Sequence, residues 1–78
     1  MTLEEKVIEI ISEQLGIPKE ECVPTAAFIE DLGADSLDLF ELVMTMEEAF
    51  HTVISDAEIK KIRTVRDIMD FLRNKGVS

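Results

Sequence analysis

One serine in this chain occupies a position where a hydroxyl could be modified. Ser36 follows the loop residues Gly33-Ala34-Asp35 and falls in the first turn of a predicted helix. A hydroxyl there is exposed, and a phosphodiester formed on it would place negative charge near the positive helix end, worth about 0.3–1 kcal/mol. By itself this pattern permits such a modification but does not require it. The alternative is that Ser36 is only a helix-start residue.

Two other chemistries for this segment fail on residue type. A serine hydrolase needs a general base, but the only histidine is His51, and no Gly-x-Ser-x-Gly motif surrounds Ser36. An EF-hand loop beginning at Asp31 would need Asp or Asn, Gly and Glu where the chain has Gly33, Ser36 and Leu42. We therefore expect no catalytic residue and no specific metal site, only loose binding of divalent cations.

Helix start and stop signals divide the chain into four helical segments. The start signals are the capping boxes Thr2-Leu3-Glu4-Glu5 and Ser55-Asp56-Ala57-Glu58, the segment Thr64-Val65-Arg66-Asp67 and the N-cap Asp35. The first helix ends at Gly16, the second runs from about Ser36 to Phe50, and the last ends at Gly76. Since no strand pattern appears, we predict an all-α fold: a small four-helix bundle of three main helices and one short helix.

Apolar side chains recur at helical spacing and define the predicted core. They are Leu3, Val7, Ile10, Ile11 and Leu15; Leu39, Leu42, Val43, Met46 and Phe50; Ile59 and Ile62; and Val65, Ile68, Met69 and Leu72. Residues 17–34 have no sustained period, but they include the apolar residues Ile17, Val23, Phe28, Ile29 and Leu32. We predict a long ordered loop pinned to the core between helices one and two, a length typical of functional loops in small domains.

Charge is distributed unevenly along the 78 residues, for which we expect a single domain, 1–78. The net charge is −9, and no basic residue lies between Lys19 and Lys60, where 11 of the 17 acidic residues are found. Nucleic acid and anionic membranes are poor partners for such a surface, whereas basic proteins are good ones.

The chain has no apolar run of transmembrane length and no signal peptide, so we expect a cytoplasmic monomer. Cys22 is expected to be a part-buried loop thiol.

The outer face of the second predicted helix is both apolar and acidic. It carries Leu37, Glu41, Met44 and Glu48, flanked by Phe40 and Glu47. A simple amphipathic helix would place only polar residues on this face. The pattern favours docking to basic patches that contain an apolar socket. The alternative is a solvated acidic face with incidental apolar side chains.

Three segments carry a resemblance to a known family: Gly33-Ala34-Asp35-Ser36-Leu37-Asp38, Glu41-Leu42-Val43-Met44 and Glu47-Glu48. Together they resemble the free-standing acyl carrier proteins of bacterial or organellar fatty-acid synthesis. The likeness extends from Glu4-Glu5, through Gln14-Leu15-Gly16, to the last helix. It implies a carrier rather than an enzyme.

The resemblance also implies the cofactor and the partners. A phosphopantetheinyl transferase, assisted by magnesium, would attach 4′-phosphopantetheine to Ser36, and the thiol of that arm would hold acyl groups as thioesters. Asp35 and Asp38 would border the transferase's magnesium site. The other implied partners are ketosynthases, reductases, a dehydratase and acyltransferases with basic docking patches. The implied recognition residues are Leu37, Asp38, Glu41, Met44, Glu47, Glu48 and Asp56.

By the same resemblance, a growing acyl chain enters a pocket between the second and third helices. The expected lining residues are Phe28, Val43, Met46, Ile54, Ile59 and Ile62. The alternative is that these side chains form ordinary core.

Departures from the family pattern cluster after Phe50. Ser55 replaces a usual proline, Ile59 a usual small residue and Lys60 a usual acid. These departures leave open the length of the acyl chain and the choice of partners. They also leave a second possible function, a carrier for polyketide, nonribosomal peptide or specialised lipid assembly. The rival of a different class is a helical adaptor that never carries an arm.

Overall fold

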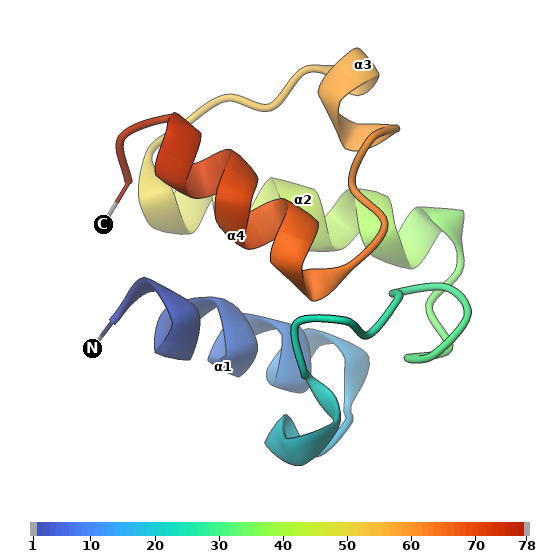
Figure 1. Ribbon diagram of the computed structural model, residues 1–78. Helices are drawn as coiled ribbons and strands as arrows, with labels where there is room; N and C mark the ends of the chain where they lie inside the picture. The colour runs from blue at the N-terminus through green and yellow to red at the C-terminus, as the bar shows by residue number, and fades with distance from the viewer. Residues whose placement is uncertain (1, 78) are drawn as a thin grey trace.

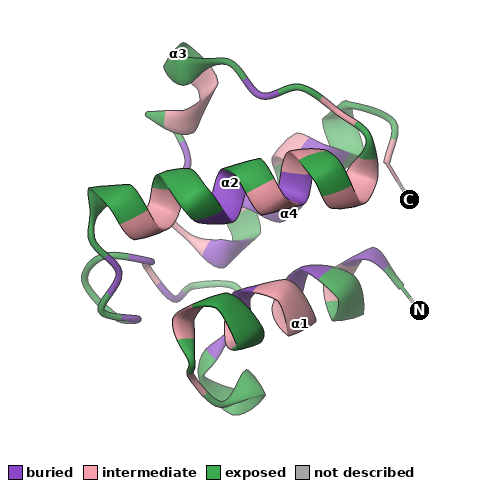
Figure 2. Cartoon of the chain, turned by 180° about the vertical axis from the view of Figure 1, so that it is seen from behind, coloured by how far each residue is buried: buried purple, intermediate pink, exposed green. Residues whose placement is uncertain are grey.

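Helices account for most of the computed structural model, which describes residues 2–77. The elements are α1 (Leu3–Leu15), a 3₁₀ turn η1 (Lys19–Glu21), α2 (Ser36–Phe50), α3 (Asp56–Ile59) and α4 (Val65–Asn74) (Figure 1). The three long helices surround the core, and α3 lies on the side of α2 and α4 that is remote from α1 (Figures 1 and 2). The predicted all-α bundle is confirmed. The short turn η1 was not predicted, because a 3₁₀ turn of three residues leaves no periodic signal.

All four α-helices begin with a reciprocal capping box. The boxes pair Thr2 with Glu5, Asp35 with Asp38, Ser55 with Glu58, and Thr64 with Asp67. In each box both the N-cap and the N3 side chain accept a backbone N–H that the first turn would otherwise leave unpaired. These hydrogen bonds also lower the pKa of two N3 carboxyls. For Glu5 the backbone N–H of Thr2 has the larger effect and the Thr2 hydroxyl the smaller one, and for Glu58 the backbone and hydroxyl of Ser55 act in the same way. The predicted start signals are confirmed.

The C-terminal end of α2 has an unusual cap. Its C-cap residue His51 adopts the left-handed conformation at φ 52°, and its N–H donates to the carbonyl of Glu47. His51 is the one non-glycine residue with positive φ among residues 2–77. Glycine commonly takes this role, as Gly16 does after α1 at φ 66°. Histidine is among the residues that tolerate it better than most.

The core joins the long helices to the loop before α2. Its largest fully buried side chains are Phe28, Ile11, Leu42, Met46, Ile68 and Leu72. The predicted core positions Ile10, Leu15, Leu39, Phe50 and Ile59 are only partly buried. All five pack against the buried cluster without being enclosed by it.

The loop of residues 17–34 is ordered and attached to the core, as predicted, but by a different set of side chains. Cys22, Ala26, Phe28, Leu32 and Ala34 are buried. The other apolar residues of the loop were also expected to attach it to the core. For Val23 and Ile29 this expectation was wrong, because they are 47% and 52% exposed. Apolar character alone does not tell which side of an aperiodic segment faces inward.

Backbone hydrogen bonds tie this loop to the segment before α4. The N–H of Phe28 donates to the Arg63 carbonyl at 2.9 Å, and the N–H of Val65 donates to the Ala26 carbonyl at 3.1 Å. Between these bonds lies the isolated antiparallel bridge of Ala27 and Thr64. The far end of the loop is held by the Ala34 N–H, which donates to the Phe28 carbonyl at 2.9 Å. The residues that lead into α2 are thereby fixed relative to α4.

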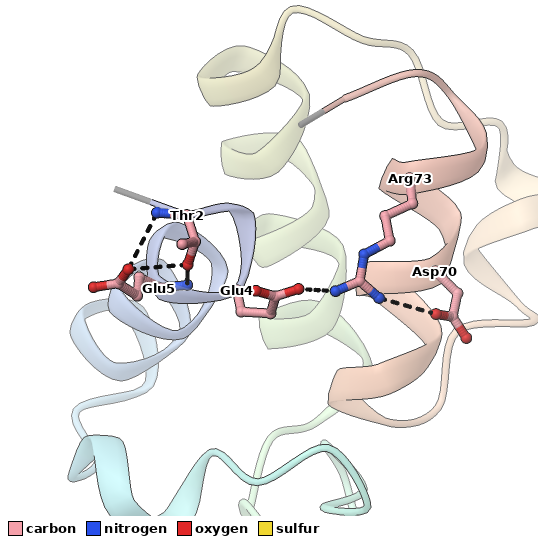
Figure 3. A network of polar contacts seen from close by, with 5 residues as sticks. All are labelled: Thr2, Glu4, Glu5, Asp70 and Arg73. Atoms are coloured by element: carbon pink, nitrogen blue, oxygen red, sulfur yellow. Dashed lines mark hydrogen bonds and ion pairs between the residues drawn. The ribbon is translucent and has the colours of Figure 1, made fainter.

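An ion pair joins the outer surfaces of α1 and α4. Arg73 of α4 contacts the carboxylate of Glu4 in the first turn of α1 and also lies 3.5 Å from Asp70 (Figure 3). The Arg73 and Glu4 side chains are about half exposed. Such a pair contributes little to stability, typically about 0–1 kcal/mol, because water and salt screen it.

The thiol of Cys22 should be unreactive in the folded protein. Burial raises its pKa, and nearby Glu21 and Glu20 raise it further. At pH 8 we expect slow reaction with a disulfide reagent in buffer and fast reaction in denaturant, measured by absorbance. The unfolded thiol ionises at a lower pH than the folded one. The free energy of unfolding should therefore fall as the pH rises from near 9.0, the ordinary thiol pKa, to the raised pKa of the folded protein, and should not depend on this group well below pH 9.0. A Cys22→Ala variant with an unchanged alkaline stability profile would contradict this assignment.

Candidate functional site

Ser36 is the first residue of α2 and is exposed to solvent. The hydrogen bonds at this helix start join its neighbours Asp35 and Asp38 and do not involve the Ser36 hydroxyl. Its Oγ therefore lies at the positive end of a 15-residue helix without an internal partner to displace. This environment fits a covalently attached phosphate group, which needs an approachable oxygen and gains from the helix dipole.

The two carboxylates beside Ser36 already have a structural task. The Asp38 N–H donates to Asp35 Oδ1 at 2.8 Å, and the Asp35 N–H donates to Asp38 Oδ2 at 3.2 Å. Each carboxylate thus keeps one oxygen outside the capping box. Residues 2–77 contain no group of three or more His, Cys, Asp or Glu side chains placed to hold a metal ion. A cation at Ser36 would therefore need ligands from elsewhere.

The outer face of α2 combines apolar and acidic side chains, as the sequence predicted. Leu37, Met44 and Phe40 are 63%, 48% and 44% exposed, and Glu41 and Glu48 are also exposed. Figure 2 shows this largely exposed face along the length of α2. Asp56, at the start of α3, is exposed as well. The arrangement leaves several large apolar side chains in water beside unpartnered negative charge, which is costly unless another molecule covers them.

Glu47 has a different environment from the other acidic residues of this set. It is half-buried, and its Oε2 accepts a hydrogen bond from the N–H of Ile54 at 2.8 Å. The carboxylate therefore fastens the connection between α2 and α3 to the side of α2. Helical spacing placed Glu47 among the expected docking residues. Such spacing shows on which face a residue lies, but not whether a following loop folds onto it.

A cavity of about 280 Å³ lies between the loop at residues 27–30, α2 and α3. Its apolar lining includes the expected Phe28, Ile59 and Ile62. The other expected lining residues, Val43, Met46 and Ile54, are buried in the core and do not line it. The sequence analysis missed the other members of the lining, which are Ala27, Ile29, Glu30, Leu39, Lys60 and Arg63.

Comparison with known proteins agrees with this geometry. The model of the family described as "Phosphopantetheine attachment site" matches residues 5–72. An acyl carrier protein of Syntrophus aciditrophicus (strain SB) is 56% identical over 78 residues, covering 100% of this chain and 98% of the relative. The chain belongs to the acyl carrier protein family.

Two further matches support the same family. An acyl carrier protein of Nitratidesulfovibrio vulgaris (strain DP4) is 55% identical over 75 residues, covering 96% of this chain and 99% of the relative. Among solved structures, a putative acyl carrier protein from Mycobacterium tuberculosis superimposes with a TM-score of 0.88 at 28% identity, covering 95% of this chain and 99% of the other. The helical arrangement is therefore that of the family.

Family membership establishes the kind of protein. Its members are carriers rather than enzymes, and the group they carry is phosphopantetheine. The arm supplies a terminal thiol on which an acyl group is held. Within residues 2–77 no helix is long and apolar enough to cross a membrane.

The bond between Glu47 and Ile54 can be tested against its neighbour on the same helix. Replacing Glu47 with Ala should lower the free energy of unfolding by about 1–3 kcal/mol, because the Ile54 N–H loses a charged acceptor. Glu48→Ala removes an equal charge from an exposed site and should change stability by less than about 0.5 kcal/mol. Urea denaturation of the two variants measures the difference. Equal destabilisation would show that charge, not the hydrogen bond, matters.

Proposed function

We propose that this protein carries growing acyl chains as thioesters on a 4′-phosphopantetheine arm attached to Ser36, and delivers them to the enzymes of fatty acid biosynthesis. The observation that carries the proposal is the exposed, unengaged hydroxyl of Ser36 at the N-terminus of α2. It lies inside the segment that matches the phosphopantetheine attachment family.

In the attachment reaction, the Ser36 oxygen bonds to the phosphorus that bears the pantetheine of coenzyme A. The phosphoanhydride bond breaks, adenosine 3′,5′-bisphosphate leaves, and the hydroxyl proton passes to the transferase. The uncommitted oxygens of Asp35 and Asp38 lie beside this centre and can approach the transferase's magnesium ion. The capping box keeps the serine at the helix start before and after the reaction.

Attachment is tested by intact mass. Incubation with coenzyme A, magnesium and a phosphopantetheinyl transferase should add the mass of one phosphopantetheine to the parent chain and nothing to Ser36→Ala. Ser55→Ala is the matched control, because Ser55 is also an exposed serine at a helix start and the variant should still be fully loaded. If the parent chain gains no mass while the transferase modifies another carrier, the adaptor without an arm becomes the better description.

Delivery requires a docking surface, and we assign it to the outer face of α2 with the start of α3. The exposed Leu37 and Met44 supply apolar contact, while Glu41, Glu48 and Asp56 attract basic patches. Partners with such patches would be the transferase and the ketosynthases, reductases, dehydratase and acyltransferases of fatty acid synthesis. A cytoplasmic monomer suits repeated, transient encounters of this kind.

Charge reversal on this face should weaken partner binding. Glu41→Lys or Glu48→Lys should each raise the Kd for a basic ketosynthase by about three- to tenfold at low salt. Glu13→Lys, on the exposed surface of α1, changes net charge equally and should have a much smaller effect. Surface plasmon resonance at two salt concentrations measures this, with differences shrinking at high salt. Equal effects of all three variants would mean that net charge alone governs association.

A specialised carrier is the second candidate, and one feature favours it. Lys60 and Arg63 bring positive charge to the cavity between α2 and α3, in a chain whose net charge is −9. Such charge can pair with a polar or acidic cargo, which a saturated acyl chain does not offer. Which ketosynthase accepts the loaded protein distinguishes the two candidates.

A further inference from the structure

The cavity beside α3 has an unusual polar side. Its apolar lining is accompanied by three charged residues, Glu30, Lys60 and Arg63. Two positive groups and one negative group leave the cavity one positive charge in excess. Every Asp, Glu, Lys or Arg between Lys19 and Lys60 is acidic, and Lys60 and Arg63 come directly after that stretch. The cavity therefore brings positive charge next to the acidic part of the chain.

The charged side-chain groups of Lys60 and Arg63 do not help to hold the fold together. The ion pairs formed within residues 2–77 join Arg73 to Glu4 and Asp70, and Lys75 to Glu58. Lys60 and Arg63 take part in none of them, and both residues are exposed. The Arg63 backbone is nonetheless fixed, since its carbonyl accepts from Phe28 and its N–H donates to Asp67 Oδ2 at 3.0 Å. Arg63 thus extends from an anchored segment at the cavity.

The cavity also has a path from the helix that bears the attachment site. A shallow groove between α2 and α3 is lined by Phe40, Asp56, Ile59 and Lys60. It shares Ile59 and Lys60 with the cavity, so the two hollows meet at these residues. A chain that leaves Ser36 and follows α2 past Phe40 would reach Ile59 and Lys60, which line both hollows, and would pass Asp56 in the groove. The volume of about 280 Å³ lies just below the ~300–1,000 Å³ usual for small-molecule pockets, which suits a short chain.

We infer that this cavity receives short acyl chains that end in a carboxylate, with the methylene groups against Phe28, Leu39, Ile59 and Ile62 and the carboxylate beside Lys60 and Arg63. The inference rests on the proposed function, because the chain must be tethered at Ser36. A hydrocarbon chain would gain only apolar contact, whereas an acyl chain with a terminal carboxylate also meets opposite charge at a rim where water still hydrates it. Desolvation, which usually cancels the gain from a buried ion pair, is therefore limited.

The test compares two cargoes of equal chain length. The transferase loads the protein with hexanoyl-pantetheine or 5-carboxypentanoyl-pantetheine from the coenzyme A thioesters, and intact mass verifies each product. Carbon-13 in the terminal carboxylate reports its titration by NMR, and the methyl groups of Ile59 and Ile62 report entry into the cavity. We expect both cargoes to shift the methyl signals and the carboxylate to titrate about 1 unit below the free carboxypentanoyl-pantetheine.

Variants identify the source of that shift. Lys60→Gln combined with Arg63→Gln should return the carboxylate to its free titration midpoint while leaving hexanoyl entry unchanged. Lys61→Gln removes an adjacent positive charge that does not line this cavity and should retain most of the shift. Loading of the parent chain with an unshifted carboxylate, or a shift that survives the double substitution, overturns the inference and leaves the carrier function intact. Failure of all loading overturns the proposed function, and this inference with it.

Discussion

The burial of Phe28 is the constraint on which the rest of the structure depends. Its side chain is fully buried, its N–H donates to Arg63 ahead of α4, and its carbonyl accepts from Ala34 ahead of α2. One residue thus joins the long loop to the segments that lead into two helices. Replacing a buried Phe by Ala typically costs about 3–5 kcal/mol, a large share of the ~5–15 kcal/mol that stabilises a whole domain. The same ring lines the cavity between α2 and α3, so the core and the cavity share a wall.

The acidic residues fall into two groups with different consequences. Glu5, Asp38, Glu58 and Asp67 each occupy the N3 position of a capping box, where negative charge satisfies backbone N–H groups and complements the helix dipole. The carboxylates of Glu41 and Glu48 lie on the open face of α2 and have no such partner among residues 2–77. Their mutual repulsion opposes folding slightly, and the proposed docking to a basic partner would relieve it.

The helix α3, which forms one wall of the cavity, has few buried contacts with the rest of the bundle. This helix has four residues, none of them fully buried, and a helix so short has no stability of its own in water. It is held by its capping box, by the buried Ile62 that follows it and by the Glu47 bond to Ile54 that precedes it. An element with few buried contacts opens at low cost. The proposed entry and release of an acyl chain would use this low-cost opening of α3.

The sequence by itself determined the elements and the helix start at which the proposed attachment residue, Ser36, lies. Capping residues and the 3.6-residue period are local, so they located all four helices, the Asp35–Ser36 helix start and the mixed face of α2 without knowledge of the fold. Only the tertiary structure decided which aperiodic residues face inward. It buried Cys22 and Ala34 but left Val23 and Ile29 in water, folded the 51–55 connection onto Glu47, and placed Leu39, Lys60 and Arg63 around the cavity in place of Val43, Met46 and Ile54. These outcomes depend on contacts between residues far apart in the chain, and no local pattern encodes such contacts.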